Sequence, residues 1–171
     1  MTIQTNHRTD TLTASGGAGT LSGFSIPAGN GPAFSAYATA NTTISSATFT
    51  KVSFNTEVFD TNNNFDSTTN YRFTPTVAGY YQLNAAIYVY SSAPSSRSIR
   101  LYKNGSAYQM GSLFVTTPPA EIGLTYSGLV YFNGSTDYAE IYVFDNGVTP
   151  IIYGNSTSSL VWFSGSMARA A

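Results

Sequence analysis

Residues 77–89 read Val-Ala-Gly-Tyr-Tyr-Gln-Leu-Asn-Ala-Ala-Ile-Tyr-Val, and they decide the fold because every second residue is apolar. The odd positions from Tyr81 to Val89 are all apolar, whereas the even positions include Gln82 and Asn84. This period-two alternation predicts a β-strand with one face in a hydrophobic core.

A corner precedes this strand. Phe73-Thr74-Pro75 predicts the end of the previous strand, because proline cannot continue a ladder of hydrogen bonds. Ala78-Gly79 then predicts a tight turn, since glycine tolerates a positive φ.

The aromatic spacing around this corner resembles that of a known family. Phe73, Gly79 and Tyr81 follow a pattern of Phe, five residues, Gly, any residue and Tyr, and here the sequence resembles the globular head domain of the complement C1q family. Leu83 stands where that family usually has an aromatic residue. The resemblance extends over about residues 32–168, through Phe54, Asp60 and Phe65, an opening strand at Pro32–Ala36 and a closing strand at Phe163–Gly165.

Two departures from the family pattern lie in loops. The segment from Phe65 to Phe73 holds one residue more than the usual spacing, and Gly134–Asp137 matches the family's Gly-Asp turn loosely. The resemblance implies an all-β jelly roll of the C1q/tumour necrosis factor type that forms a compact homotrimer. Without cysteines, a signal peptide or a collagen stalk, the sequence looks like a phage or bacterial member and not an animal ligand.

The composition limits the classes of function. A length of 171 residues suits one domain with a real core. Only 9% of the residues are charged, against roughly 25% in an average protein, and this predicts that partners cover part of the surface. A net charge of −1 provides no field for nucleic acid or an anionic membrane.

The chain divides into an arm and a body. Residues 1–31 are glycine-rich around one strand-like piece at 20–27, and residues 32–171 form the predicted jelly-roll domain. About ten strands are expected, at 32–39, 46–58, 70–75, 79–90, 97–103, 107–115, 123–132, 137–144, 149–153 and 159–168. Three dipeptides predict tight hairpins with positive φ: Asn104-Gly105, Asn133-Gly134 and Asn146-Gly147.

Catalytic and metal-binding chemistry has little support. The single histidine, His7, lies in the arm, and there is no cysteine, so we expect no enzyme and no cofactor. The segment Asp60–Asp66 offers oxygen ligands for calcium, but Phe65 and Tyr71 occupy EF-hand positions that require Gly and Glu. We therefore favour a loop whose side chains cap their own backbone, with no metal.

Several aromatic residues fall on the register opposite the expected core. If Tyr81, Leu83, Ile87, Ala139, Ile141, Val143, Phe163 and Met167 fill the sandwich, their neighbours point outward. The C1q resemblance implies a threefold axis, and we assign to it Tyr80, Tyr88, Tyr142 and Trp162.

Two functions remain open at this stage. The first is a phage capsid decoration or cement protein on the virion surface, anchored to the major capsid protein or another virion protein by Ile3, His7, Arg8, Leu21 and Phe24. The alternative is the receptor-binding tip of a tail fibre or bacterial surface structure, which would bind a host-surface glycan.

Overall fold

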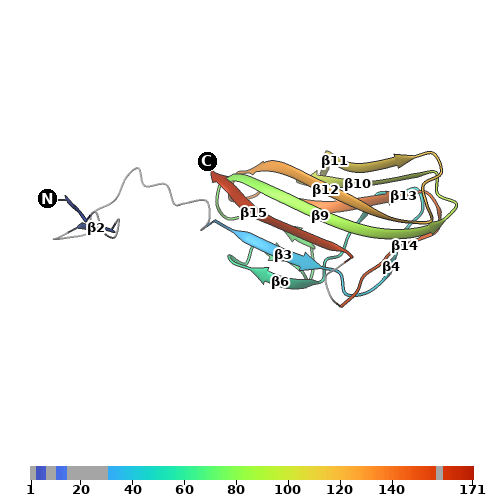
Figure 1. The fold of residues 1–171 in the computed structure, drawn as a ribbon, viewed down its shortest axis with the longest axis horizontal. Coiled ribbons are helices and arrows are strands. Elements are labelled where there is room, and N and C mark those ends of the chain that lie inside the picture. Colours follow the sequence, from blue (N-terminus) through green and yellow to red (C-terminus); the bar gives the residue numbers. More distant parts are fainter. Residues whose placement is uncertain (1–2, 7–10, 15–30, 157–159) are drawn as a thin grey trace.

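The computed structural model describes residues 3–6, 11–14, 31–156 and 160–171, and every regular element in them is a β-strand. Two antiparallel sheets face one another as a sandwich (Figure 1). The core lies between them and is closed by aromatic rings, with Phe34 stacked on Phe73 at 4.3 Å and meeting Phe163 edge-on at 4.9 Å. The prediction of an all-β sandwich is confirmed.

The strands fall into three sheets. The seven-stranded sheet contains β4 (Thr42–Thr43), β14 (Val148–Ile152), β9 (Gly79–Ser92), β15 (Trp162–Ala170), β3 (Ala33–Tyr37) and β6 (Thr56–Asp60), with β12 (Glu121–Phe132) on the other side of β9. The six-stranded sheet contains β11 (Ser106–Val115), β10 (Ser96–Lys103), β13 (Ala139–Asp145), β8 (Arg72–Phe73) and β7 (Phe65–Asp66), with β5 (Thr50–Lys51) beside β13. The third sheet lies in the arm and pairs β1 (Ile3–Asn6) with β2 (Thr11–Ala14).

Strand β9 is the centre of the seven-stranded sheet. It pairs with β12 from Gly79 to Tyr90 and with β15 on its other side. Its odd residues are buried and its even residues face outward, as the alternation predicts. All eight residues expected in the core are buried.

The predicted strand at 46–58 is wrong, because it is two strands in different sheets. β5 pairs with β13, and β6 pairs with β3 in the opposite sheet. Between them Val52 and Phe54 are buried, so the alternation continues through a segment that crosses from one sheet to the other. The two-residue strands β4 and β7 are too short to show a period.

The arm contains two strands that were not predicted. The strand-like piece at 20–27 lies outside the described residues. The strands that the structure does describe there are β1 and β2, which pair from Ile3 opposite Ala14 to Asn6 opposite Thr11. Both are rich in threonine and polar residues and lack the apolar alternation that marks a buried strand.

The hairpin dipeptides behave differently from one another. Asn104 and Gly105 both have positive φ, at 53° and 76°, as predicted. In the second pair Gly134 has φ 72°, whereas Asn133 does not have a positive φ and its side chain accepts hydrogen bonds from the backbone N–H groups of the next turn.

The third dipeptide and the Ala78-Gly79 turn contradict the prediction of positive φ. Neither Asn146 nor Gly147 is in the left-handed region, and the Asn146 side chain instead accepts the N–H groups of Ser95 and Ser96. Gly79 instead allows β15 to approach β9 closely, since a Cβ there would lie 2.5 Å from the backbone oxygen of Arg169.

One edge of the sandwich is closed where β11 meets β12. The Ser112 hydroxyl accepts the N–H of Thr125 at 3.0 Å and donates to its carbonyl oxygen at 3.1 Å. Gly111 lies at this junction, because a Cβ there would come within 2.4 Å of the Thr125 oxygen and 2.8 Å of Ile99.

Substitution of Gly111 by alanine should therefore open this edge. We expect Gly111→Ala to lower the free energy of unfolding by about 1–3 kcal/mol, since backbone and core atoms would have to move. Gly123→Ala in β12 is the matched control, because its Cβ would meet nothing within 4 Å, and its effect should stay within about 0.5 kcal/mol. Urea denaturation of both variants measures the difference, and equal effects would contradict the close approach.

Candidate functional site

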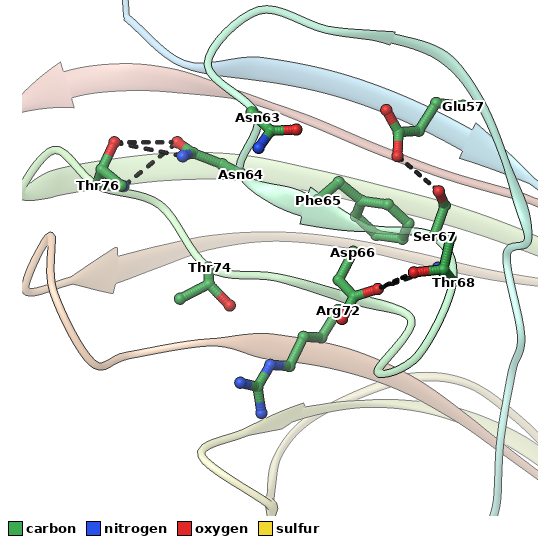
Figure 2. A pocket seen from close by; sticks show the side chains of 10 residues that line it. All are labelled: Glu57, Asn63, Asn64, Phe65, Asp66, Ser67, Thr68, Arg72, Thr74 and Thr76. Atoms are coloured by element: carbon green, nitrogen blue, oxygen red, sulfur yellow. Dashed lines mark hydrogen bonds between the residues drawn. The ribbon is translucent and has the colours of Figure 1, made fainter.

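A polar hollow of about 550 Å³ lies beside strands β6, β7 and β8 (Figure 2). Asn63, Asn64, Asp66, Thr74 and Arg72 contribute polar groups to its wall, and Phe65 contributes a buried ring. The hollow includes most of the segment from Asp60 to Asp66 considered above for calcium.

Both carboxylates of this segment are engaged with their own backbone. Asp60 Oδ2 accepts the N–H of Phe65 at 2.6 Å, and Asp60 Oδ1 accepts that of Asn62 at 3.2 Å. Asp66 accepts the N–H groups of Thr68, Thr69 and Asn70 at 2.9–3.1 Å. The capping interpretation of this loop is confirmed. Among the described residues, no group of three or more acidic or histidine side chains could together hold a metal ion.

Hydrogen bonding also sets the charge of Asp66. Backbone N–H groups, that of Thr69 foremost, hold the pKa of Asp66 well below its ordinary value of 3.8, because they stabilise the carboxylate form. A folded-state pKa below the unfolded value adds stability that is present above pH 4 and is lost as the pH falls.

Asp66→Asn should remove this contribution. At pH 7 we expect the variant to be less stable by about 1 kcal/mol, as for the loss of a capping carboxylate. The difference should shrink as the pH falls from about 5 toward 2.5, because Asp66 of the wild type then takes up a proton in the unfolded chain before it does so in the folded protein, while the amide of the variant does not titrate. Denaturation at several pH values tests this, and a difference independent of pH would show that the charge is unimportant.

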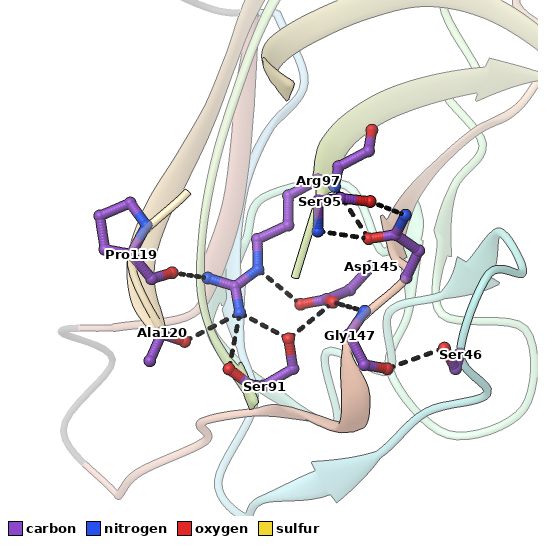
Figure 3. A network of polar contacts seen from close by, with 10 residues as sticks. Ser46, Ser91, Ser95, Arg97, Pro119, Ala120, Asp145 and Gly147 are labelled. Atoms are coloured by element: carbon purple, nitrogen blue, oxygen red, sulfur yellow. Dashed lines mark hydrogen bonds and ion pairs between the residues drawn. The ribbon is translucent and has the colours of Figure 1, made fainter. Parts of the chain in front are cut away.

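A buried ion pair lies at one end of the sandwich, between β10 and β13 (Figure 3). Arg97 Nε donates to Asp145 Oδ2 at 2.7 Å, and both side chains are fully buried. The guanidinium also donates to the carbonyl oxygens of Pro119 and Ala120, and Ser91 donates to Asp145. The pair thus joins β9, β10, β13 and the loop before β12, and its role is structural.

The four residues assigned to a trimer axis do not share one surface. Tyr80 and Tyr88 lie on β9 and Trp162 on the adjacent β15, whereas Tyr142 lies on β13 in the opposite sheet. The Tyr88 hydroxyl donates to Glu121 Oε2 at 2.9 Å. Burial, and then the nearby Glu140 carboxylate, raise the pKa of Tyr142.

Comparison with known proteins identifies the fold. No family model and no curated protein matches the sequence. Among solved structures, the globular domain of the zebrafish complement 1qA protein is 15% identical, with a TM-score of 0.57 over 83% of this chain and 100% of that one. Eiger TNF from S. frugiperda is 7% identical, with a TM-score of 0.58 over 83% of this chain and 96% of that one. The fold is the C1q/TNF jelly roll.

A viral protein shares this jelly roll. PRD1 vertex protein P5 is 15% identical, with a TM-score of 0.52 over 81% of this chain and 97% of that one. The resemblance inferred from Phe73, Gly79 and Tyr81 is thus confirmed at the level of fold.

On the C1q/TNF jelly roll, an exposed apolar patch extends from the predicted Tyr80. The apolar patch consists of Tyr80, Leu129 and Tyr131, which are 42%, 52% and 40% exposed. The rings of Tyr80 and Tyr131 are 5.4 Å apart, and the patch borders a shallow hollow lined also by Ala168–Ala171. Leu129 and Tyr131 were not predicted, although they alternate with the buried Val130 and Phe132 and so had to point outward.

The residues expected to anchor the jelly roll lie in the arm. Ile3 is in β1, which pairs with β2. His7, Arg8, Leu21 and Phe24 lie outside the described residues. In the described part of the chain, no helix is long and apolar enough to cross a membrane.

Proposed function

We propose that this chain is a non-enzymatic structural protein of a virion, a homotrimer on the particle surface whose arm, residues 1–31, anchors it to the coat. The likeness in fold to PRD1 vertex protein P5, a phage protein, is the observation that carries the placement in a virion. The role that we propose is capsid decoration or cement.

Self-association is supported by the apolar patch. The patch exposes the rings of Tyr80 and Tyr131 beside the aliphatic side chain of Leu129. Burial of this apolar surface against another subunit would be favourable. Aromatic residues are enriched in protein–protein interfaces. We assign this patch, together with Tyr88 and Trp162 on the same sheet, to the trimer interface.

Anchoring is supported by the hairpin in the arm. Within the described part of the chain, β1 and β2 pair only with each other, so each strand has one edge without a partner strand there. An isolated two-stranded hairpin is marginally stable in water, so it gains by adding its edge to a sheet of a partner. Three arms on one trimer would bind together and raise the avidity.

The ionisable groups support a structural and not a catalytic role. Three carboxylates are held in ion pairs, Glu140 by Lys51, Asp145 by Arg97 and Asp137 by Lys103, while Asp60 and Asp66 cap their own loop. Carboxylates engaged in this way are bonded within the fold and do not face a substrate as a general acid or base must.

Deletion of residues 1–31 tests the anchor. We expect the truncated protein to keep its oligomeric mass in light scattering and to lose binding to purified particles in a co-sedimentation assay. A truncated trimer that still sediments with the particles would show that the arm is not the anchor.

The second candidate is a receptor-binding tip, and one feature favours it. At the end of the sandwich opposite the C terminus, the end of β11 exposes Leu113, Phe114 and Val115 (Figure 1). The next two residues, Thr116 and Thr117, have φ of 70° and 47°, which is strained for β-branched side chains. Strain of this kind is concentrated at binding sites.

A further inference from the structure

The outward side of the six-stranded sheet carries aromatic rings and unpaired cations. Strand β13 pairs with β10 on one side and with β5 on the other, so Tyr142 lies between Arg100 and Lys51 across the sheet. The outer aromatic face is defined by six residues: Phe49, Arg72, Arg100, Tyr102, Tyr138 and Tyr142.

The rings of this face are packed against one another as a platform. Tyr102 and Tyr142 are stacked with ring centroids 3.9 Å apart, and the ring of Phe49 lies 6.3 Å from that of Tyr102. All three are half-buried, so packing holds their rings in place while part of each side chain stays exposed to solvent.

Two guanidinium groups lie over aromatic rings of this face. The Cζ of Arg100 is 4.5 Å from the ring centroid of Phe49, and that of Arg72 is 4.3 Å from the centroid of Tyr138. Arg100 stands opposite Tyr142 on one side of β13, whereas Arg72 lies in β8 on the other side of β13, so the two cations flank this strand. Stacking fixes each fork of donors before a ligand arrives.

Both guanidinium groups lack acceptors. Among the described residues, neither Arg72 nor Arg100 makes an ion pair or a side-chain hydrogen bond, and Arg100 Nε is buried without a partner. In Figure 2 the guanidinium of Arg72 points away from the Asp66 carboxylate. The carboxylate on this face, Glu140, is already bonded to Lys51 at 3.1 Å. The exposed donors of these groups are therefore free to bind an acceptor from outside.

We propose that the outer aromatic face binds a polysaccharide that carries carboxylate groups on some of its sugar rings. Each guanidinium would bind one carboxylate through paired hydrogen bonds, and the exposed parts of the aromatic side chains would contact the sugar rings between them. This inference adds a ligand to the molecule and does not depend on the proposed place in a virion.

The charge distribution favours such a polymer over nucleic acid. The chain has a net charge of −1, and the two free guanidiniums of this face lie on either side of β13, so the outer aromatic face offers no continuous basic surface for a phosphate backbone. A polymer with widely spaced carboxylates matches the two cations.

Titration calorimetry of the full chain with a galacturonate oligomer tests the proposal. We expect binding that weakens with added salt, that is at least about tenfold weaker in Arg100→Met and in Arg72→Met, and that is unchanged in Arg169→Met. Arg169 is the matched control because it is exposed on β15 of the other sheet. The methyl-esterified oligomer, which has the same rings without the charge, should also bind at least about tenfold more weakly.

Three outcomes would overturn the proposal: no binding of the oligomer, equal binding of its methyl ester, or equal binding by Arg100→Met. Circular dichroism of each variant confirms the fold. Arg100→Lys gives a second readout, because it keeps the charge and removes the fork, and intermediate affinity is expected.

Discussion

Replacement of Arg97 by methionine is expected to lower the free energy of unfolding by about 3–5 kcal/mol. The substitution leaves Asp145 fully buried without its cation, and it takes the donors from the carbonyl oxygens of Pro119 and Ala120. A buried charge without a partner is among the most destabilising changes that a single substitution can make. Chemical denaturation followed by tryptophan fluorescence measures the loss.

A double variant separates the ion pair from the rest of the network. Arg97→Met with Asp145→Leu should recover part of the loss, because no buried charge remains, while the two carbonyl oxygens still lack donors. Arg169→Met, at an exposed position, is the control and should change stability by less than about 0.5 kcal/mol. A loss below about 1 kcal/mol for Arg97→Met would contradict the buried pair.

The second large effect is expected for the oligomer. Leu129→Glu should convert the proposed trimer into the 18.2 kDa monomer at micromolar concentration. The substitution places a carboxylate in the apolar patch of each subunit, where it would be buried near the carboxylates of the other two. Like charges brought together in an interface cost several kcal/mol, which corresponds to at least about a hundredfold weaker association.

Light scattering coupled to gel filtration measures this change. Val148→Glu is the matched control, because Val148 is more exposed than Leu129, at 64%, and lies outside the apolar patch. A Leu129→Glu protein that keeps the mass of the wild type would remove the apolar patch from the interface. The same measurement on Tyr88→Glu and Tyr142→Glu tells which sheet faces the axis.

The fold could be predicted from the sequence because the long strands show a clear pattern. The alternation of β9 and the spacing of Phe73, Gly79 and Tyr81 were sufficient, because a strand with one buried face repeats every two residues. Short strands such as β4 and β7 have no period, and the segment from β5 to β6 keeps its alternation while it changes sheets. Register within a strand was therefore predictable, whereas the assignment of strands to sheets was not.

Because the assignment of strands to sheets could not be predicted, the residues of a candidate surface could not be grouped correctly either. Tyr142 was grouped with Tyr88 because both point outward, and the pairing that sets them on opposite sheets is a long-range property. The buried pair left a signal that was missed: Arg97 shares the inward register of Ile99 and Leu101. A charge in that register predicts an opposite charge on a neighbouring strand.

The most direct test of the proposed function is the copy number of this polypeptide in purified virus particles, measured by quantitative mass spectrometry against the major coat protein. A decoration or cement trimer predicts many copies in a fixed ratio to the coat protein. A handful of copies would favour a fibre tip, and complete absence from the particles would contradict the placement in a virion.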